Sequence, residues 1–287
     1  MTKLFSRNFQ VRWSEMGAGQ RVRASQYMDY LVETAYDWGA SNQLGFEESS
    51  QLGLIWVILE TDIHFLRPLR YPESFDFSIW MLEWRRVHGT RAFELRLKDS
   101  DSVIARGVQK IASLDADTLR PKQPPAELIE GFRMAEPPAM EQQAFPSLEA
   151  VPENAFELQR HVQWGAIDAL EHLNHGRSLG YVEDVLAHFL AAQDWPLERL
   201  QEKGWAAVAN RVHVRYREAG YWNEALRVRC YPLELTDTGA INAVVIEKES
   251  DGKVVLEATY AWDLMQVPGD KRIALPEKLR SKLQSTI

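Results

Sequence analysis

The chain has 287 residues, which is enough for two domains, because single hydrophobic cores stop growing at roughly 250 residues. Acidic residues outnumber basic ones by 41 to 33, and the net charge of -8 argues against nucleic-acid binding. Cys230 is the only cysteine, which excludes an internal disulfide and a cysteine-based zinc site. No apolar run reaches the roughly 20 residues of a membrane span, and residues 1–10 lack the apolar core of a signal peptide. We therefore expect a cytoplasmic protein.

In chain order, each half is expected to begin with a short strand that ends near a tryptophan and continues into one long amphipathic helix. Apolar residues at helical spacing place these helices at residues 24–38 and 177–192. Runs rich in β-branched and aromatic residues, separated by turn residues, then predict strands in both halves. In the second half the expected strands are residues 205–216, 224–235, 241–249 and 254–266.

The two halves match when the sequence is shifted against itself by 151 residues. Val11–Trp13 then meets Val162–Trp164, and Tyr30 meets Tyr181. Few residues are identical, but the expected elements follow the same order in both halves. The sequence therefore predicts an internal duplication.

A proline-rich segment separates the two halves. Seven of the 13 prolines lie between Arg120 and Pro152, where strand-forming residues are scarce. We therefore expect a first domain at residues 1–130, a linker at 131–155 and a second domain at 156–287.

The repeated order of strand, long helix and antiparallel strands resembles two fused copies of the hotdog fold, an α+β fold with a helix packed on a curved sheet. Asp62–Pro68 and Val212–Gly220 both follow the rhythm of that fold. More specifically, the chain resembles the acyl-acyl-carrier-protein (acyl-ACP) thioesterases of plants and bacteria, which are tandem hotdogs of nearly this length. The resemblance implies a fatty acyl thioester hydrolase, and no cofactor is expected. No metal is expected either, because the pair His172 and His175 has no third ligand in the sequence. The acyl channel of such a hydrolase would lie in the first domain and its catalytic residues in the second.

The segment Trp164–His175 carries the sharpest part of this resemblance. The family pattern has an Asp, an Asn two residues later, a His two residues further on, and then a hydrophobic residue and an Asn. Asp168, His172 and Asn174 fit the pattern, whereas Leu170 stands in place of the first Asn. The resemblance therefore marks the three matching residues as catalytic.

A second stretch, Tyr216–Gly220, resembles the Tyr-Arg-Arg-Glu-Cys-Gly sequence of the same family with one Arg missing. On that alignment Glu218 takes the place of the catalytic Glu, and Ala219 takes the place of the Cys. A thiol nucleophile is then excluded, because Cys230 lies on the apolar face of an expected strand and is typical of a core residue.

Thioester hydrolysis needs a group that activates water or attacks the carbonyl carbon, together with donors that stabilise the oxyanion. Asp168 is the candidate for the first task, either as general base or as nucleophile. Unpaired N–H groups at the start of the following helix are candidate oxyanion donors. His172 would orient the carboxylate or the water, with Glu218 fixing its tautomer. Asn174 would hold the loop or the thioester oxygen, and an Asn at this place is also typical of a helix cap.

The first half provides an internal control for these four candidates. At the same offset, Gly17, Arg21, Arg23 and Arg67 stand opposite them, in that order. The first half is expected to build the same strand-to-helix connection without an Asp or a His. Their presence in the second half alone therefore favours a functional role.

Three functions remain open from the sequence. The first is hydrolysis of a fatty acyl chain from acyl carrier protein. The second is hydrolysis of acyl-CoA, because Trp164–Asp168 also resembles the opening of the hydroxybenzoyl-CoA type of hotdog hydrolase. The third is a double hotdog that binds acyl chains without turnover, which the departures at Leu170 and Ala219 support. A hotdog dehydratase is disfavoured, because its acid would be Glu33, and Asp184 simply repeats that acid.

The expected partners are therefore acyl carrier protein or acyl-CoA, and neither nucleic acid nor a membrane. The chain itself would be a monomer or a homodimer of the double unit. Acyl length and head group are not determined by these patterns.

Overall fold

The computed structural model describes residues 4–100, 102–134, 138, 140, 148 and 150–286. The chain forms two compact units. The first unit consists of Met1–Trp13 and Met28–Gln142, and the second of Ser14–Tyr27 and Gln143–Ile287. Much of the expected linker lies outside the described residues, namely 135–137, 139, 141–147 and 149.

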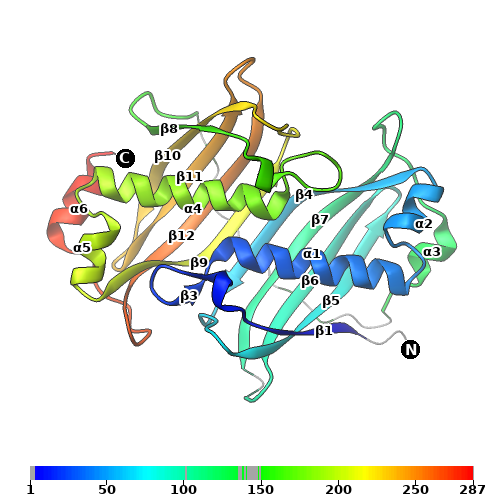
Figure 1. Cartoon of the computed structure of the whole chain (residues 1–287), viewed down its shortest axis with the longest axis horizontal. Helices are drawn as coiled ribbons and strands as arrows, with labels where there is room; N and C mark the ends of the chain where they lie inside the picture. Colours follow the sequence, from blue (N-terminus) through cyan, green and yellow to red (C-terminus); the bar gives the residue numbers. More distant parts are fainter. Residues whose placement is uncertain are drawn as a thin grey trace. The chain divides into compact units, whose positions relative to one another are not determined.

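The first unit contains one long helix and an antiparallel sheet (Figure 1). The strands follow the order β1-β5-β6-β7-β4 across this sheet. Helix α1 begins in the second unit and runs on through the first. In chain order the elements are β1 (Phe5–Gln10), α1 (Ala24–Ser41), α2 (Phe46–Gln51), β4 (Leu54–Phe65), β5 (Ser74–Arg85), β6 (His88–Leu97), β7 (Val103–Asp115) and α3 (Ala126–Glu130).

Both faces of this sheet carry buried apolar side chains, although only the face toward α1 is apolar along its length. On the face toward α1, the fully buried Phe75 of β5 packs against Tyr30 of the helix, with ring centroids 4.9 Å apart. On the opposite face, Trp80, Ala92 and Val108 form a separate buried cluster. Alternate residues of a strand point to opposite faces, and β5 alternates accordingly, with Phe75 and Phe77 buried and Asp76 half-buried between them.

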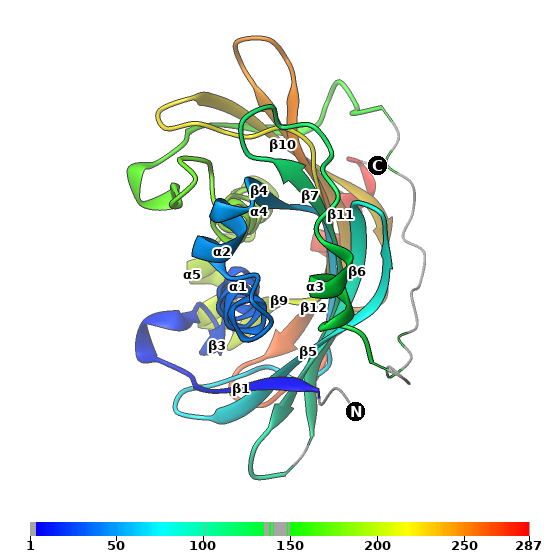
Figure 2. The same cartoon turned by 90° about the vertical axis from the view of Figure 1, so that its right-hand side faces the viewer.

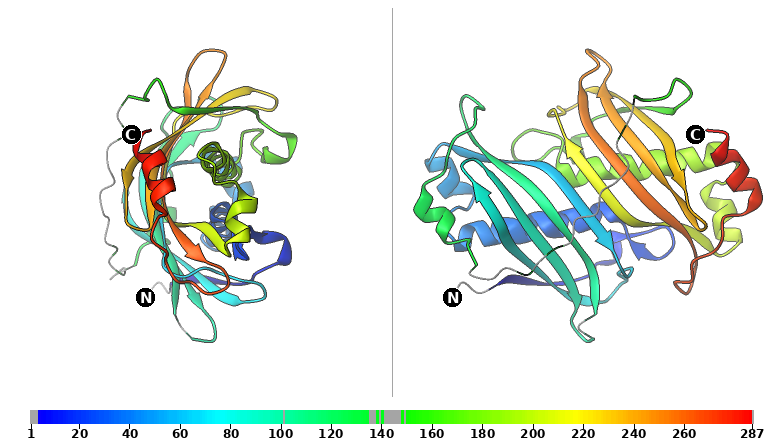
Figure 3. Two further views of the ribbon diagram at one scale, coloured as in Figure 1. Left: turned by 90° about the vertical axis from the view of Figure 1, so that its left-hand side faces the viewer. Right: turned by 180° about the vertical axis from the view of Figure 1, so that it is seen from behind.

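The second unit repeats this plan, with strand order β9-β12-β11-β10-β8. The sheet curves around helix α4, which lies on its concave face in the side and back views (Figures 2 and 3). Its elements are the short ribbon β2 (Met16–Gly17) and β3 (Arg21–Val22), then β8 (Phe156–His161), α4 (His175–Ala192), α5 (Leu197–Glu202), β9 (Trp205–Tyr216), β10 (Ala225–Leu235), β11 (Gly239–Lys248), β12 (Val254–Gln266) and α6 (Glu277–Gln284).

Buried apolar residues at regular spacing account for the helix and the strands of the second unit. Val182, Val185 and Phe189 are buried at helical spacing on α4. On β10, Val228 and Cys230 are fully buried, which confirms the prediction that the cysteine is a core residue. Burial raises the pKa of the Cys230 thiol far above its ordinary value, so it is no source of thiolate. No helix among the described residues is long and apolar enough to cross a membrane.

Candidate active site

A tight loop connects the 3-10 turn Trp164–Ala166 to the start of α4. Ile167 and Leu173 pair as an isolated antiparallel bridge at its base. Inside the loop, the Asp168 N–H donates to the His172 carbonyl at 3.0 Å, and the Glu171 N–H donates to the Asp168 carbonyl at 3.0 Å. These bonds make residues 168–172 a closed turn that holds the Asp168 side chain in place.

The Asp168 carboxylate is half-buried and accepts a hydrogen bond at each oxygen. Its Oδ1 accepts from the backbone N–H of Leu170 at 2.9 Å, and its Oδ2 accepts from Asn174 Nδ2 at 3.4 Å. Leu170 thus supplies a donor through its backbone, although it lacks the side-chain amide of the family pattern. These two hydrogen bonds fix the orientation of the carboxylate that is the candidate general base or nucleophile.

Asn174 serves both as helix cap and as a partner of Asp168. Its Oδ1 accepts from the N–H groups of Gly176 at 2.9 Å and Arg177 at 3.2 Å, which makes it the N-cap of α4. The same amide can donate only from its nitrogen, and that nitrogen faces Asp168. The cap therefore fixes which end of the amide reaches the carboxylate.

His172 is half-buried and packs against an aromatic ring at the loop surface. Its imidazole meets Tyr221 edge to face, with centroids 5.2 Å apart. The Lys248 ammonium lies 5.0 Å from the centroid of the same Tyr221 ring. Among the described residues, the structure brings Asn174 and the Leu170 backbone to Asp168 by hydrogen bonds, and the His172 imidazole is not part of that set.

Glu218 lies just beyond the end of β9, and its side chain is exposed. Its backbone N–H donates to Val255 at 3.3 Å. Its carboxylate is close enough to Lys253 to add to the effect of Asp251, whose hydrogen bond is the main cause of the raised pKa of that lysine. The described contacts therefore place Glu218 with the charged turn before β12, and none of them links it to His172.

Two neighbours of the loop were not predicted from the sequence. The Tyr216 hydroxyl donates to the carbonyl of His175 at 3.2 Å, and the two rings pack edge to face at 6.0 Å. The carbonyl of Gly220 accepts from the Leu173 N–H at 2.8 Å. A Cβ on Gly220 would lie 3.2 Å from the Leu173 side chain, so this close approach favours glycine. The stretch Tyr216–Gly220 therefore supports the loop through its first and last residues.

Exposed aromatic pairs flank the two 3-10 turns of the duplicated chain. Trp164 is 76% exposed and meets Trp222 edge to face at 5.9 Å in the second unit. In the first unit, Trp13 is 75% exposed and meets Tyr71 at 5.7 Å. Because the pair occurs in both halves, it belongs to the shared scaffold and does not mark the active half.

The segment before α1 corresponds to the candidate loop, but different bonds hold it. Arg21 is only 4% exposed, and its Nη2 donates to Asp270 at 2.7 Å. Helix α1 follows Arg23, which has no acceptor with which to cap it. Glu183 of α4 takes over that task, since its two carboxylate oxygens accept from Ala24 N at 2.8 Å and Ser25 N at 3.2 Å.

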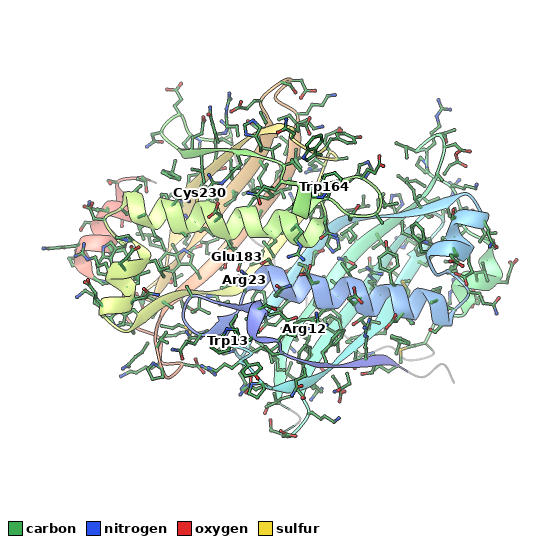
Figure 4. The ribbon with its side chains drawn as sticks, in the orientation of Figure 1. Arg12, Trp13, Arg23, Trp164, Glu183 and Cys230 are labelled. Carbon is green, nitrogen blue, oxygen red and sulfur yellow. The ribbon has the colours of Figure 1, made fainter. Side chains whose placement is uncertain are left out.

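Glu183 and Arg23 lie close together in Figure 4. Burial raises the pKa of the Glu183 carboxyl, and its hydrogen bonds to Ser25 and Ala24 and the charge of Arg23 oppose that rise. Burial raises the pKa of Tyr260 well above its ordinary value, and the charge of Glu183 raises it further. The counterpart of the candidate loop is thus a closed structural junction.

Two family models match the chain. Residues 2–132 match the acyl-ACP thioesterase N-terminal domain, and residues 162–283 match the thioesterase-like superfamily. The first match carries the name of the acyl-ACP thioesterases and the second that of a broader thioesterase group, and each covers a little under half of the chain. Asp168, His172 and Asn174 lie in the part that matches the broader thioesterase-like superfamily.

Among curated proteins, a palmitoyl-acyl carrier protein thioesterase of Cuphea hookeriana is 22% identical over 191 residues. That match covers 62% of this chain and 46% of the Cuphea protein, so the chain matches about half the length of this relative. The long-chain acyl-CoA thioesterase FadM of Escherichia coli is 24% identical over 132 residues, which covers 46% of this chain and 99% of FadM.

Solved structures of acyl-ACP thioesterases share the fold. The 12:0-ACP thioesterase of Umbellularia californica superposes with a TM-score of 0.76 at 17% identity, covering 91% of this chain and 94% of that one. An acyl-ACP thioesterase of Bacteroides thetaiotaomicron gives 0.74 at 18% identity, covering 91% and 98%. The predicted α+β double hotdog is confirmed.

Proposed function

We propose that the chain hydrolyses fatty acyl thioesters to a free acid and a carrier thiol, with Asp168 as the group that activates water or attacks the carbonyl. The observation that carries the proposal is the Asp168 carboxylate, which Leu170 N and Asn174 Nδ2 hold beside the start of α4. Each oxygen accepts one hydrogen bond, which leaves a lone pair on each for a proton of water.

In the base route, Asp168 takes a proton from water while the hydroxide adds to the thioester carbonyl carbon. The C–S bond then breaks, the thiolate leaves and the acid proton returns to sulfur. In the nucleophile route, Asp168 itself adds to the carbonyl carbon, the C–S bond breaks and the thiolate leaves. Water then hydrolyses the resulting anhydride to the free acid and the Asp168 carboxylate. His172 is proposed to orient the water, and Asn174 the carboxylate. Glu218 receives no role in either route, because it is exposed near Lys253.

Acyl carrier protein is the proposed carrier, because the first family model and the Cuphea relative both bear that name. Acyl-CoA is the second candidate, since nearly the whole of FadM matches part of this chain. We further propose a cytoplasmic enzyme with a first domain at residues 1–130 that holds the acyl chain, a linker at 131–155 and a catalytic domain at 156–287.

The experiment compares hydrolysis of the same acyl group on acyl carrier protein and on CoA. We expect measurable kcat/KM on both and a higher value on the carrier protein. The reverse preference would favour the acyl-CoA function. Tight binding of both thioesters without release of thiol would instead support an acyl-binding protein without turnover.

A further inference from the structure

Tyr221, in the turn between β9 and β10, packs against the candidate loop of the second unit. Its ring meets the His172 imidazole edge to face, with centroids 5.2 Å apart and ring planes at 80°. Among the described residues, no other ring contacts this imidazole, and no protein group forms a hydrogen bond to its nitrogens. Both nitrogens are therefore available to water or substrate, and the orientation of the imidazole depends on the Tyr221 ring.

A buried cation holds Tyr221 in place, although the tyrosine itself is 50% exposed. Lys248 is 8% exposed, and its Nζ lies 5.0 Å from the centroid of the Tyr221 ring and 3.1 Å from Glu224 Oε1. The other oxygen of Glu224 accepts a hydrogen bond from the Tyr221 backbone N–H at 3.1 Å. Because a desolvated cation is attracted to an aromatic ring more strongly than an exposed one, Lys248 limits the movement of this ring. Glu224 thus holds both the backbone of Tyr221 and the cation beside its ring.

The first half builds the same turn around a glutamate. At the offset of 151 residues, Glu73 stands opposite Glu224. Glu73 accepts a hydrogen bond from the Arg70 N–H at 2.8 Å, which repeats the bond found at Tyr221. The cation that pairs with Glu73 is Arg67, which donates to both carboxylate oxygens. The turn therefore uses a glutamate and a paired cation in both halves, but it forms without a tyrosine in the first.

The ring and the cation that support His172 occur in the second half alone. At the same offset, Arg70 stands opposite Tyr221 and Leu97 stands opposite Lys248. The first half has no histidine at the position equivalent to His172 either. The tyrosine, the lysine and the histidine therefore occur together, in the half that carries the candidate loop. Folding of the turn does not account for this combination, whereas support of the imidazole does.

We propose that Tyr221 is a positioning residue, which Lys248 holds in place and which fixes the His172 imidazole in the orientation that directs the attacking water. The inference rests on the proposed thioesterase function, in which His172 orients that water. Without the Tyr221 ring the imidazole rotates, and only part of its orientations place a nitrogen at the water. Loss of the ring therefore lowers kcat and leaves the binding of the thioester unchanged.

The test is a double-mutant cycle with Tyr221→Leu and His172→Ala. Its substrate is a palmitoyl thioester, on acyl carrier protein or on CoA, whichever wild type hydrolyses faster. We expect Tyr221→Leu to lower kcat about fivefold or more while KM stays within about twofold. In the His172→Ala background the same substitution should change kcat by less than about twofold, because no imidazole remains to be positioned.

Two further variants control for a general effect on the turn. Tyr221→Phe keeps the ring and should keep kcat within about twofold of wild type. Trp222→Leu removes the neighbouring aromatic residue, which is 61% exposed and whose ring meets Trp164, and it should leave kcat unchanged. Urea unfolding checks that each variant is folded. If Tyr221→Leu does not fold, Tyr221→Met takes its place in the cycle.

The outcomes separate this inference from the proposed function. If wild type hydrolyses neither thioester, the proposed function fails and the inference fails with it. If His172→Ala leaves kcat unchanged, the proposed role of His172 fails, and again the inference with it. If His172→Ala lowers kcat but Tyr221→Leu does not, or lowers it equally in both backgrounds, the inference alone fails. A fall for Trp222→Leu as large as that for Tyr221→Leu would also overturn it.

Discussion

The segments that precede the two long helices occupy the same place in the duplicated sequence, yet different bonds hold them. Asn174 caps α4 from within its own segment and also reaches Asp168. Arg23, at the equivalent place, cannot cap α1, and Glu183 of α4 does so instead. A local cap thus leaves one end of its amide available to hold the Asp168 carboxylate. A cap supplied from another helix leaves a closed junction.

Among the variants that test this difference between the two segments, Asn174→Ala is expected to have the largest effect. It removes the cap of α4 and the amide that holds Asp168, so we expect kcat to fall about tenfold or more and stability to fall by about 1 kcal/mol. Steady-state kinetics and urea unfolding measure the two effects. Asn174→Ser serves as control, because a serine hydroxyl keeps the cap acceptor but lacks the amide that donates to Asp168. It should regain stability without regaining kcat, and equal recovery of both would contradict the account.

A second test moves the cap of α1 back into its own segment. Glu183→Ala should lower the free energy of unfolding by about 1 kcal/mol, because two backbone N–H groups lose their acceptor. Adding Arg23→Asn, which recreates the arrangement found at Asn174, should restore most of that loss. Denaturant unfolding of both variants measures it. The role of Glu183 as a cap would be refuted if the second substitution gave no rescue.

A third and smaller effect concerns pH. Burial raises the pKa of Glu183 above its ordinary 4.5, so the folded state favours the protonated carboxyl. Stability gained from this group is greatest below the ordinary pKa and is lost as pH rises through the folded-state value. The free energy of unfolding of wild type relative to Glu183→Gln should therefore increase as pH falls from 7 toward 4. A difference that stays constant with pH would show that burial does not raise the pKa of Glu183.

The smallest effect is expected at Glu218. Because its side chain is exposed beside Lys253, Glu218→Gln should change kcat by less than about threefold. The fall in kcat measured for Asn174→Ala in the same assay is the reference. A loss as large as that of Asn174→Ala would return Glu218 to the catalytic set.

Much of the fold follows from periodicity. Strands expected at residues 205–216 and 254–266 are found as Trp205–Tyr216 and Val254–Gln266, because their β-branched and aromatic runs end at clear turn residues. The loop from Asp168 to Asn174 could also be predicted, since the residues that hold one another are six apart. The hydrogen bond from Leu170 could not be predicted. Its backbone N–H donates to Asp168, whereas the family pattern has a side-chain amide at this position.

Contacts between residues far apart in the chain could not be predicted from the sequence. Glu183 and Ala24 are 159 residues apart, and nothing in a helical pattern distinguishes Glu183 from a solvated acid. Arg91 of β6 donates a hydrogen bond to Gln109 of β7, and the sequence alone does not predict this contact, because the register of the two strands is set by the whole sheet. Only the folded structure shows which strands pair and that Glu183 of α4 caps α1.

The most direct test of the central claim is single-turnover hydrolysis of an acyl-ACP thioester by wild type and by Asp168→Asn. The asparagine keeps the size of the side chain and an acceptor oxygen for Leu170 N but removes the negative charge that takes a proton or attacks carbon. We predict a fall in rate of at least about 100-fold with unchanged unfolding behaviour. A rate within about threefold of wild type would contradict the assignment of Asp168 as base or nucleophile.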